Sequence, residues 1–224
     1  LETLQSAQRE LQSAAPSATV NIIAADLRNA AEAERMVEAV ERDFGAVDVL
    51  VNSAGAAKRT PAAELTTDAW HDAMQAKFFT YIHVINPLIK KMGARGRGAV
   101  VNVVGAGGKV AAVTHLAGGS ANAALMLASS GLAAAYAGKG VRVNAVNPGL
   151  TLTERLQEGM QAEARQQGIS MEEALARAKA TRPLGRIAEP SEIADAVVYL
   201  ASNRASYITG AVVAMDGAVT PMVV

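Results

Sequence analysis

Short apolar runs alternate with helical runs along most of this 224-residue chain. The apolar runs, such as 47–52 (VDVLVN) and 99–104 (AVVNVV), are hydrophobic at most of their positions. Strands of this kind are buried on both faces, which is typical of a parallel sheet covered by helices on both sides. Because crossovers between parallel strands are right-handed, the sheet is expected to be doubly wound. The sequence therefore predicts an α/β fold with a mostly parallel sheet.

The period of the hydrophobic pattern gives the expected elements. Strands are expected at 18–25, 47–52, 99–104, 141–146 and 211–215. Helices are expected at 1–12, 29–44, 68–92, 120–137, 153–167, 170–180 and 190–202. No internal repeat or low-complexity linker divides the chain, so residues 1–224 are expected to form a single domain.

Composition argues against several classes of function. The formal net charge is zero and no block of like charges occurs, so no nucleic-acid partner is expected. The absence of cysteine excludes disulfides and a cysteine nucleophile, and it fits a cytoplasmic location. No apolar run approaches the ~18 residues of a membrane span, so no membrane partner is expected. His71 and His83 do not share a metal-binding spacing, and no metal site is expected.

Several local patterns occur in order along the chain. Asp26–Leu27 follows the first expected strand, 52–55 (NSAG) ends the next, and 144–149 (NAVNPG) ends a later one. The C-terminal third carries 183–186 (PLGR), 207–210 (YITG) and 215–217 (MDG). Taken together, these motifs resemble those of the short-chain dehydrogenase/reductase family across nearly the whole chain. The resemblance implies a Rossmann-like fold and an activity on a carbonyl or secondary alcohol with NAD or NADP.

Three of the motif residues, Asp26, Asn52 and Pro148, lie at the carboxyl ends of expected strands, where open α/β sheets bind ligands. Small residues in these turns let the backbone approach a cofactor, and hydroxyl groups can donate to its carboxamide or phosphate. The expected cofactor contacts are Asp26, Leu27, Asn52, Ala54, Gly55, Asn122, Pro148, Gly149, Thr151 and Thr153. Asp26 is expected to accept from an adenine amino group while Leu27 flanks the ring. Helix capping is the alternative role for Asp26 and Thr153.

The first residues, LETLQSAQRELQ, already have helical spacing, with no cap before them. In the family, a preceding β-α-β unit of roughly 30 residues carries the glycine-rich phosphate-binding turn and the residue that helps to select NAD or NADP. We expect this N-terminal unit to exist in the native protein although it is absent from this sequence. Without it, the choice between NAD and NADP stays open.

The resemblance also marks the positions of the family's catalytic residues. Its serine, tyrosine and lysine correspond to Gly105, Gly118 and Asn122, and the asparagine of its long helix corresponds to Lys77. Glycine has no side-chain donor, so positions 105 and 118 cannot perform acid–base catalysis. Asn122 can hydrogen-bond a ribose hydroxyl but carries no charge. The sequence therefore predicts a degenerate, non-standard active site.

Three residues are candidates for replacement chemistry. Lys77 and Tyr81 are four residues apart on one helical face and can form a relocated acid–base pair. His115 lies three residues before Gly118, and imidazole titrates near neutrality. The structural alternatives are a solvated lysine, a tyrosine at a helix contact and a loop histidine.

Glycines gather in the same region, at 105, 107–108 and 118–119. We expect them to make room for a bulky substrate or to let a ligand approach the backbone; the alternative is a flexible loop. Segment 150–180 resembles the family's substrate lid, and its apolar residues indicate a small hydrophobic substrate, with core packing as the alternative. The helices at 68–92 and 120–137 match the family's dimer interface, so a homotetramer or homodimer is expected.

The first functional hypothesis is an NAD(P)-dependent oxidoreductase of the short-chain type with a non-standard active site. The second is a non-catalytic nucleotide-binding or scaffold protein. The third is a lyase or isomerase on the same fold that uses Lys77 or His115. The loss of a general acid typically lowers a rate by ~10²–10⁴, which is why the second and third hypotheses stay open beside the first.

Overall fold

The computed structural model describes residues 2–55 and 58–222, apart from the side chains at 155, 158, 162, 163 and 166. The helices are α1 (Glu2–Ala14), α2 (Ala30–Phe44), α3 (Thr67–Ala73), α4 (Thr80–Arg95), α5 (Leu116–Tyr136), α6 (Glu154–Gln167), α7 (Met171–Ala180) and α8 (Pro190–Ala201). The strands are β1 (Val49–Asn52), β2 (Gly98–Val103), β3 (Val141–Pro148) and β4 (Val212–Met215).

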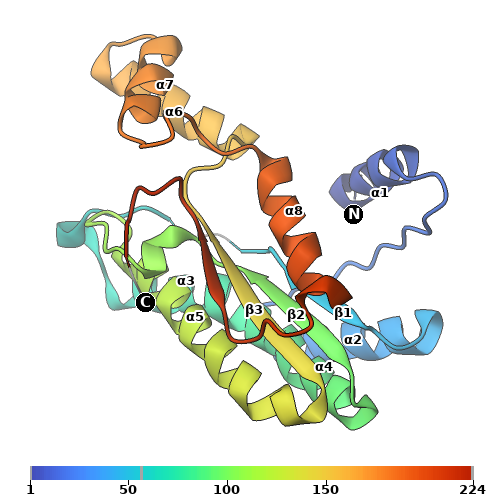
Figure 1. Ribbon diagram of the computed structural model, residues 1–224. Helices are drawn as coiled ribbons and strands as arrows, with labels where there is room; N and C mark the ends of the chain where they lie inside the picture. Colours follow the sequence, from blue (N-terminus) through green and yellow to red (C-terminus); the bar gives the residue numbers. More distant parts are fainter. Residues whose placement is uncertain (1, 56–57, 223–224) are drawn as a thin grey trace.

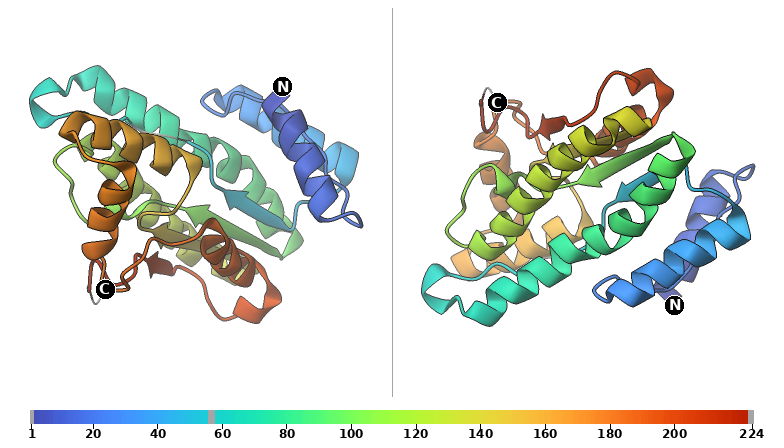
Figure 2. Two further views of the ribbon diagram at one scale, coloured as in Figure 1. Left: turned by 90° about the horizontal axis from the view of Figure 1, so that it is seen from above. Right: turned by 90° about the horizontal axis from the view of Figure 1, so that it is seen from below.

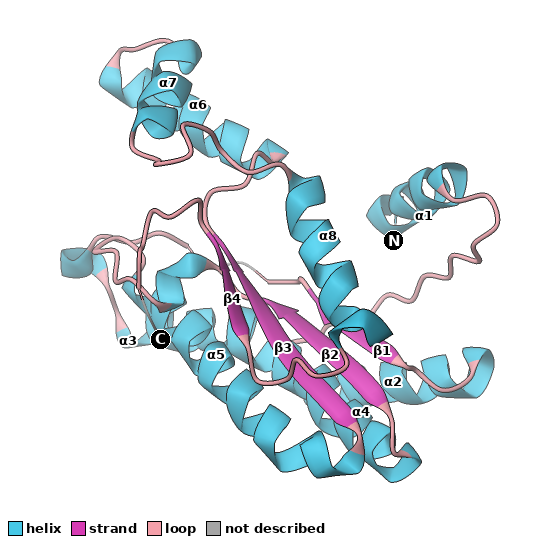
Figure 3. Cartoon of the chain, in the orientation of Figure 1, coloured by secondary structure: helices cyan, strands magenta, loops and turns pink. Residues whose placement is uncertain are grey.

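The four strands form one parallel sheet in the order β1-β2-β3-β4. Helices cover both of its faces (Figure 3). Residues of α2, α4 and α5, such as Val37, Leu88 and Leu125, build one apolar core against β2 and β3. On the other face Val197 and Leu200 of α8 form a second core with Val101, Val146 and further residues. The expected α/β fold with a doubly wound, parallel sheet is confirmed.

Helices α6 and α7 project beyond the carboxyl ends of the strands (Figure 1). They have a small apolar core of their own, which is centred on Met160, Ala164 and Ala174. Helices α1 and α2 lie at the opposite end of the molecule (Figure 2). The segment expected as a lid at 150–180 therefore stands over the edge at which the strands end, and the single-domain organisation of residues 1–224 stays a prediction.

The helix expected at 68–92 is interrupted by a π-helical turn. It runs as α3, then as a π-helix at Met74–Phe79, then as α4, whose end is capped by Gly96 at φ 74. Pro87 lies inside α4, where a proline has no N–H for the helical ladder. A π-turn inserts an extra residue into a helix and is frequent at functional sites. Here the turn contains Lys77.

The strand expected at 18–25 does not form. This segment has no regular secondary structure, and its backbone at Ala18 and Val20 bonds to side chains of α1 in place of a neighbouring strand. Gln8 donates to the Val20 carbonyl and Gln12 to the Ala18 carbonyl, each at 2.6 Å. No strand in the described ranges pairs with the outer edge of β1, and Val49 and Val51 are 43% and 45% exposed. Apolar β-branched residues favour strand, but a strand also needs a partner for its backbone.

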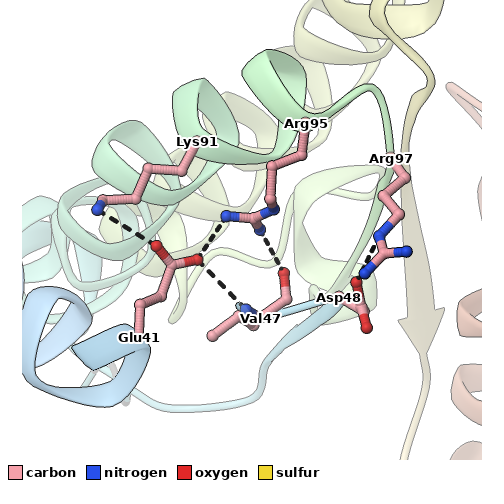
Figure 4. A network of polar contacts seen from close by, with 6 residues as sticks. All are labelled: Glu41, Val47, Asp48, Lys91, Arg95 and Arg97. Atoms are coloured by element: carbon pink, nitrogen blue, oxygen red, sulfur yellow. Dashed lines mark hydrogen bonds and ion pairs between the residues drawn. The ribbon is translucent and has the colours of Figure 1, made fainter. Parts of the chain in front are cut away.

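An ionic contact joins α2 to α4 beside the start of β1 (Figure 4). The carboxylate of Glu41 lies 2.7 Å from Arg95 and 3.2 Å from Lys91, and it accepts from the Val47 N–H. The side chain of Glu41 is only 13% exposed. Burial disfavours its charged form, but the hydrogen bonds from Val47, Arg95 and Lys91 outweigh burial and lower the pKa of the Glu41 carboxyl.

We expect Glu41→Gln to lower the free energy of unfolding at neutral pH by about 1–2 kcal/mol, because charge-assisted hydrogen bonds are lost. A lowered folded-state pKa stabilises the protein above the ordinary glutamate pKa, and this contribution is lost as the pH falls through the lowered value. The difference between the two proteins should therefore be constant near neutrality and shrink in acid, as measured by urea unfolding at several pH values.

The matched control is Asp48→Asn. Asp48 pairs with Arg97 at 3.1 Å, but these side chains are 61% and 70% exposed, so little change is expected. Two outcomes would contradict this account of the contact: equal destabilisation by both substitutions, or a loss of unfolding free energy in Glu41→Gln that stays the same in acid.

Candidate active site

The carboxyl ends of β1, β2 and β3 meet at one edge of the sheet because the ladders are parallel and in register. Asn52 pairs with Asn102, and Val103 pairs with Val146 two residues before Pro148. Ligands of open α/β sheets bind outside this edge. The expected site residues that follow these strands are thus brought to one side of the molecule.

A buried chain of polar side chains ties two of these strands to α5. The Asn52 amide donates to Asn102 Oδ1 at 2.9 Å, Asn102 donates to Ser129 Oγ at 2.9 Å, and Ser129 donates to the Leu125 carbonyl at 2.7 Å. Asn52 is 6% exposed. The amide donor of Asn52 is therefore committed to holding the end of β1, and direct cofactor contact by this residue stays a prediction.

Lys77 and Tyr81 meet as their spacing predicts. The Lys77 ammonium lies 3.1 Å from the Tyr81 hydroxyl and within 3.5 Å of the Ala54 and Val103 carbonyls. It also lies 4.8 Å from the centre of the Tyr81 ring. The ammonium therefore links the turn after β1 to the end of β2, from a helix that packs on α5.

Tyr81 is fully buried, and its hydroxyl donates to the Val103 carbonyl at 2.8 Å. Burial raises the pKa of this phenol above its usual value, because the phenolate would be poorly solvated. The hydroxyl stays protonated near neutrality and fastens the helix to β2. This favours the helix-contact alternative for Tyr81 over proton transfer.

Gly105 and Asn122, the positions predicted to correspond to the family's serine and lysine, are neighbours in space. A Cβ on Gly105 would lie 3.3 Å from Asn122 Nδ2. A Cβ on Gly107 would lie 2.9 Å from the His115 ring. Gly118 lies in the first turn of α5, one turn before Asn122 on the same helix, and both are buried. Gly105, Gly118, Asn122 and His115 thus form one cluster at the start of α5.

The glycines of this cluster do not all enlarge the site, contrary to our expectation. A Cβ at Gly108 would lie 2.3 Å from Met126 and 2.7 Å from the Ala123 backbone nitrogen. A Cβ at Gly119 would lie 2.6 Å from the Gly107 carbonyl oxygen. A larger residue would not fit at these two positions, because the Ala106–Gly108 turn packs directly on α5. Protein atoms, and not a substrate, fill the space beside them.

Asn122 leaves one polar atom unused. Its side chain is 5% exposed, and no hydrogen-bond donor among the described residues reaches its Oδ1. Buried acceptors are nearly always paired, so an unpaired one calls for an explanation. Contact of Asn122 with a cofactor ribose stays a prediction.

A cleft of about 800 Å³ lies between the edge of the sheet and the helices α6 and α7. It is lined by Lys58, Arg59, His115, Gly149, Leu150, Thr151, Thr153, Leu156, Met160, Gln167, Ile169, Ala174, Arg177, Ala178 and Thr181. His115, Gly149, Thr151 and Thr153 were expected from the sequence. Lys77, Tyr81 and Asn122 are not among its lining residues.

Backbone contacts with Ala188 hold the segment that leads from β3 into α6. Thr151 and Ala188 form an isolated parallel bridge, and Leu152 donates its N–H to the Ala188 carbonyl at 2.8 Å. Thr153 caps α6 by accepting from the Leu156 N–H, which is the capping role weighed for it. A Cβ on Gly149 would lie 3.1 Å from Asp216, so the turn after Pro148 passes close to the end of β4.

Asp26 and Leu27 lie apart from this cleft, in the turn before α2. Asp26 accepts from the Arg28 N–H at 3.0 Å, while Asn29 is the residue that caps α2. Leu27 packs against the core, and its carbonyl lies 2.9 Å from His83 Nδ1. Adenine contact by these two residues stays a prediction.

Sequence reasoning did not single out Lys58, Arg59 and Arg177. They are scattered over a loop and α7, and they converge only in the folded chain. Across the described positions, no cluster of three or more histidine, aspartate or glutamate side chains suits a metal ion. In the same part of the chain, none of the helices has the length and apolar character needed to cross a bilayer.

Comparison with known proteins finds relatives that are dehydrogenases or reductases. A protein-family model described as enoyl-(acyl carrier protein) reductase matches residues 2–220. D-threitol dehydrogenase of Mycolicibacterium smegmatis is 35% identical over 197 residues, which cover 88% of this chain and 72% of that protein.

Two solved structures share the fold at 27–30% identity. The NADPH-bound short-chain oxidoreductase of Pseudomonas aeruginosa PAO1, described as containing an atypical catalytic center, is 30% identical with a TM-score of 0.88 and covers 99% of this chain and 84% of its own. L-sorbose reductase of Gluconobacter frateurii, with NADPH and L-sorbose, is 27% identical with a TM-score of 0.92 and covers 100% and 85%. On the family match, the sequence identities and the shared fold, this chain belongs to the short-chain dehydrogenase/reductase family.

Proposed function

We propose that this chain is an NAD(P)-dependent oxidoreductase that interconverts a secondary alcohol and a carbonyl compound through a non-standard active site. The observation that carries the proposal is the cleft of about 800 Å³ at the carboxyl edge of the sheet, where His115 and Thr151 face the space between strands and lid. The family relationship supports the redox chemistry. The glycines at the serine and tyrosine positions support the non-standard site.

The residues at this edge fit NAD or NADP. The unpaired Asn122 Oδ1 is a buried acceptor suited to a ribose hydroxyl. The segment from Pro148 to Thr153 offers hydroxyl donors, whereas the space beside Gly55 is filled by the Ala76 carbonyl oxygen, 2.4 Å from where a Cβ would lie. Two relatives with this fold have been solved with NADPH bound. When bound, NAD(P)H supplies a hydride to the carbonyl carbon of the substrate.

His115 is the best placed group to handle the proton. Among the candidates for replacement chemistry it is the one that lines the cleft, and imidazole changes charge near neutrality. In reduction His115 would donate a proton to the substrate carbonyl oxygen, and in oxidation it would accept the proton of the hydroxyl group. Lys77 and Tyr81 act as positioning residues, because they hold the Val103 carbonyl and do not line the cleft.

The same proposal includes a homo-oligomer in the cytoplasm. The outer face of α5 consists of small and apolar residues, and Leu127 on this face is 77% exposed. A Cβ on Gly131, one turn further on, would meet nothing within 4 Å. A flat face of this kind allows close approach of a second copy through helix packing. We propose a dimer through this face as the minimum assembly.

We expect the protein, with its N-terminus verified by intact mass, to bind NADH or NADPH with micromolar affinity in a calorimetric titration. The reason is the fit of Asn122 and of the turn after β3 to the nucleotide. Binding would also settle the cofactor preference. A folded protein that binds neither nucleotide would overturn the oxidoreductase proposal and favour a scaffold or a cofactor-free lyase or isomerase.

We expect His115→Ala to lower kcat by about 10²–10⁴ and to remove the inflection near neutral pH from the rate profile, because the proton donor is lost. His71→Ala is the matched control, since His71 is an exposed histidine of α3. Tyr81→Phe should lower stability by about 1 kcal/mol and leave the pH profile in place. Wild-type turnover by His115→Ala would contradict the assignment.

We expect Leu127→Glu to halve the sedimentation mass of the protein at micromolar concentration, because a charge would be buried between two copies of α5. Leu11→Glu on α1 is the control, as Leu11 is also exposed, at 57%. An unchanged mass for Leu127→Glu would place any interface elsewhere.

A further inference from the structure

The cleft below the lid has an uneven charge that the redox chemistry does not require. Three cationic side chains line it, those of Lys58, Arg59 and Arg177, and no carboxylate does so among the described residues. The whole chain has a formal net charge of zero. Glu173 pairs with Arg177 at 2.6 Å, so the uncompensated positive charge comes from Lys58 and Arg59 and results from their placement and not from the composition.

The cations come from two walls of the cleft. Lys58 and Arg59 belong to the loop after β1, whereas Arg177 belongs to α7 of the lid. The loop is tied beside His115, because the Thr60 N–H donates to the Thr114 carbonyl at 2.9 Å. This bond fixes the two loop cations next to the segment that carries the proposed proton donor.

The three cations differ in how they are held. Arg177 is anchored by Glu173 at 2.6 Å and by Gln167 at 3.3 Å, which orients its guanidinium along α7. Lys58 and Arg59 are exposed, and no ion pair to either occurs among the described residues. Unneutralised cations at the wall of a cleft raise the local concentration of anions.

The remaining wall is apolar. Leu156, Met160, Ile169 and Ala174 line the cleft and also belong to the core of the lid. A ligand that contacts both the cationic and the apolar residues of the cleft has a negatively charged oxygen group at one end and an apolar chain attached to it. We infer that the substrate is an oxo or hydroxy compound with an apolar chain that ends in an anionic carboxylate or phosphate group. Lys58, Arg59 and Arg177 bind this anionic group while the carbonyl reaches His115. This inference rests on the proposed function. This adds a charged end to the hydrophobic substrate expected from the sequence.

The test uses three ketones with the same 6-oxo chain and different end groups: 6-oxoheptanoate, its neutral methyl ester and 6-oxoheptyl phosphate, each with the preferred nicotinamide cofactor. We expect kcat/KM for at least one anion to exceed that of the ester by on the order of tenfold, since charge-assisted hydrogen bonds are formed to it alone. The anion with the higher kcat/KM shows whether the site prefers a carboxylate or a phosphate. Added salt should raise KM for the anion and leave the ester unaffected. An ester used as well as both anions would overturn the inference.

The variant K58E/R59E should lose the preference for the anion, so that kcat/KM for both anions falls to or below that of the ester. Arg9→Glu is the matched control, because Arg9 is an exposed arginine of α1 far from the cleft in sequence. If circular dichroism shows that K58E/R59E fails to fold, K58A/R59A replaces it. A preference that survives both changes, or an equal loss for ester and anion, would contradict the inference.

Calorimetric titration of heptanoate, heptyl phosphate and heptan-1-ol separates this inference from the proposed function. Binding of an anion that K58E/R59E weakens and Arg9→Glu does not would support the anion site even without turnover of any ketone. Turnover of the ester together with no binding of either anion would leave the oxidoreductase proposal intact and overturn the anion site.

Discussion

The parallel ladder that joins β1, β2 and β3 is the interaction on which the candidate site depends. It aligns Asn52 with Asn102 and brings Val103 close to the level of Pro148, so that loops far apart in sequence begin at one edge. The amide chain from Asn52 through Asn102 to Ser129 adds directional bonds inside the protein, where an unpaired amide would be costly. Strand register and helix position are thereby coupled.

The Val103 carbonyl shows how this coupling reaches the loops. It accepts from the Tyr81 hydroxyl and lies 3.4 Å from the Lys77 ammonium, which also approaches the Ala54 carbonyl. Lys77 lies in the π-helical turn and Tyr81 in the first turn of α4, and both side chains contact the end of β2. The contacts of Lys77 and Tyr81 thus join the helix to the ends of β1 and β2, and a catalytic role for either residue stays a prediction.

The sequence was sufficient for the sheet, most of the helices and the pairing of Lys77 with Tyr81, because these follow from local periodicity. It was misleading at 18–25, where β-branched residues favour a strand but the backbone bonds to Gln8 and Gln12. The tight contacts of Gly108 and Gly119 depend on how one turn packs on α5, which no local pattern records. Lys58, Arg59 and Arg177 come together only through the tertiary fold. In the sequence each of them is typical of a solvent-exposed charged residue, so their common position at the cleft could not be predicted.

The outer edge of β1 is an open side of the described sheet. Its backbone faces no strand in the described part of the chain, and Val49 and Val51 expose apolar surface beside it. An unpaired edge of this kind is a template for pairing with a further strand. The flank of β1 is therefore a surface on which another strand can extend the sheet, whereas the loops that border the cleft begin at the ends of the strands.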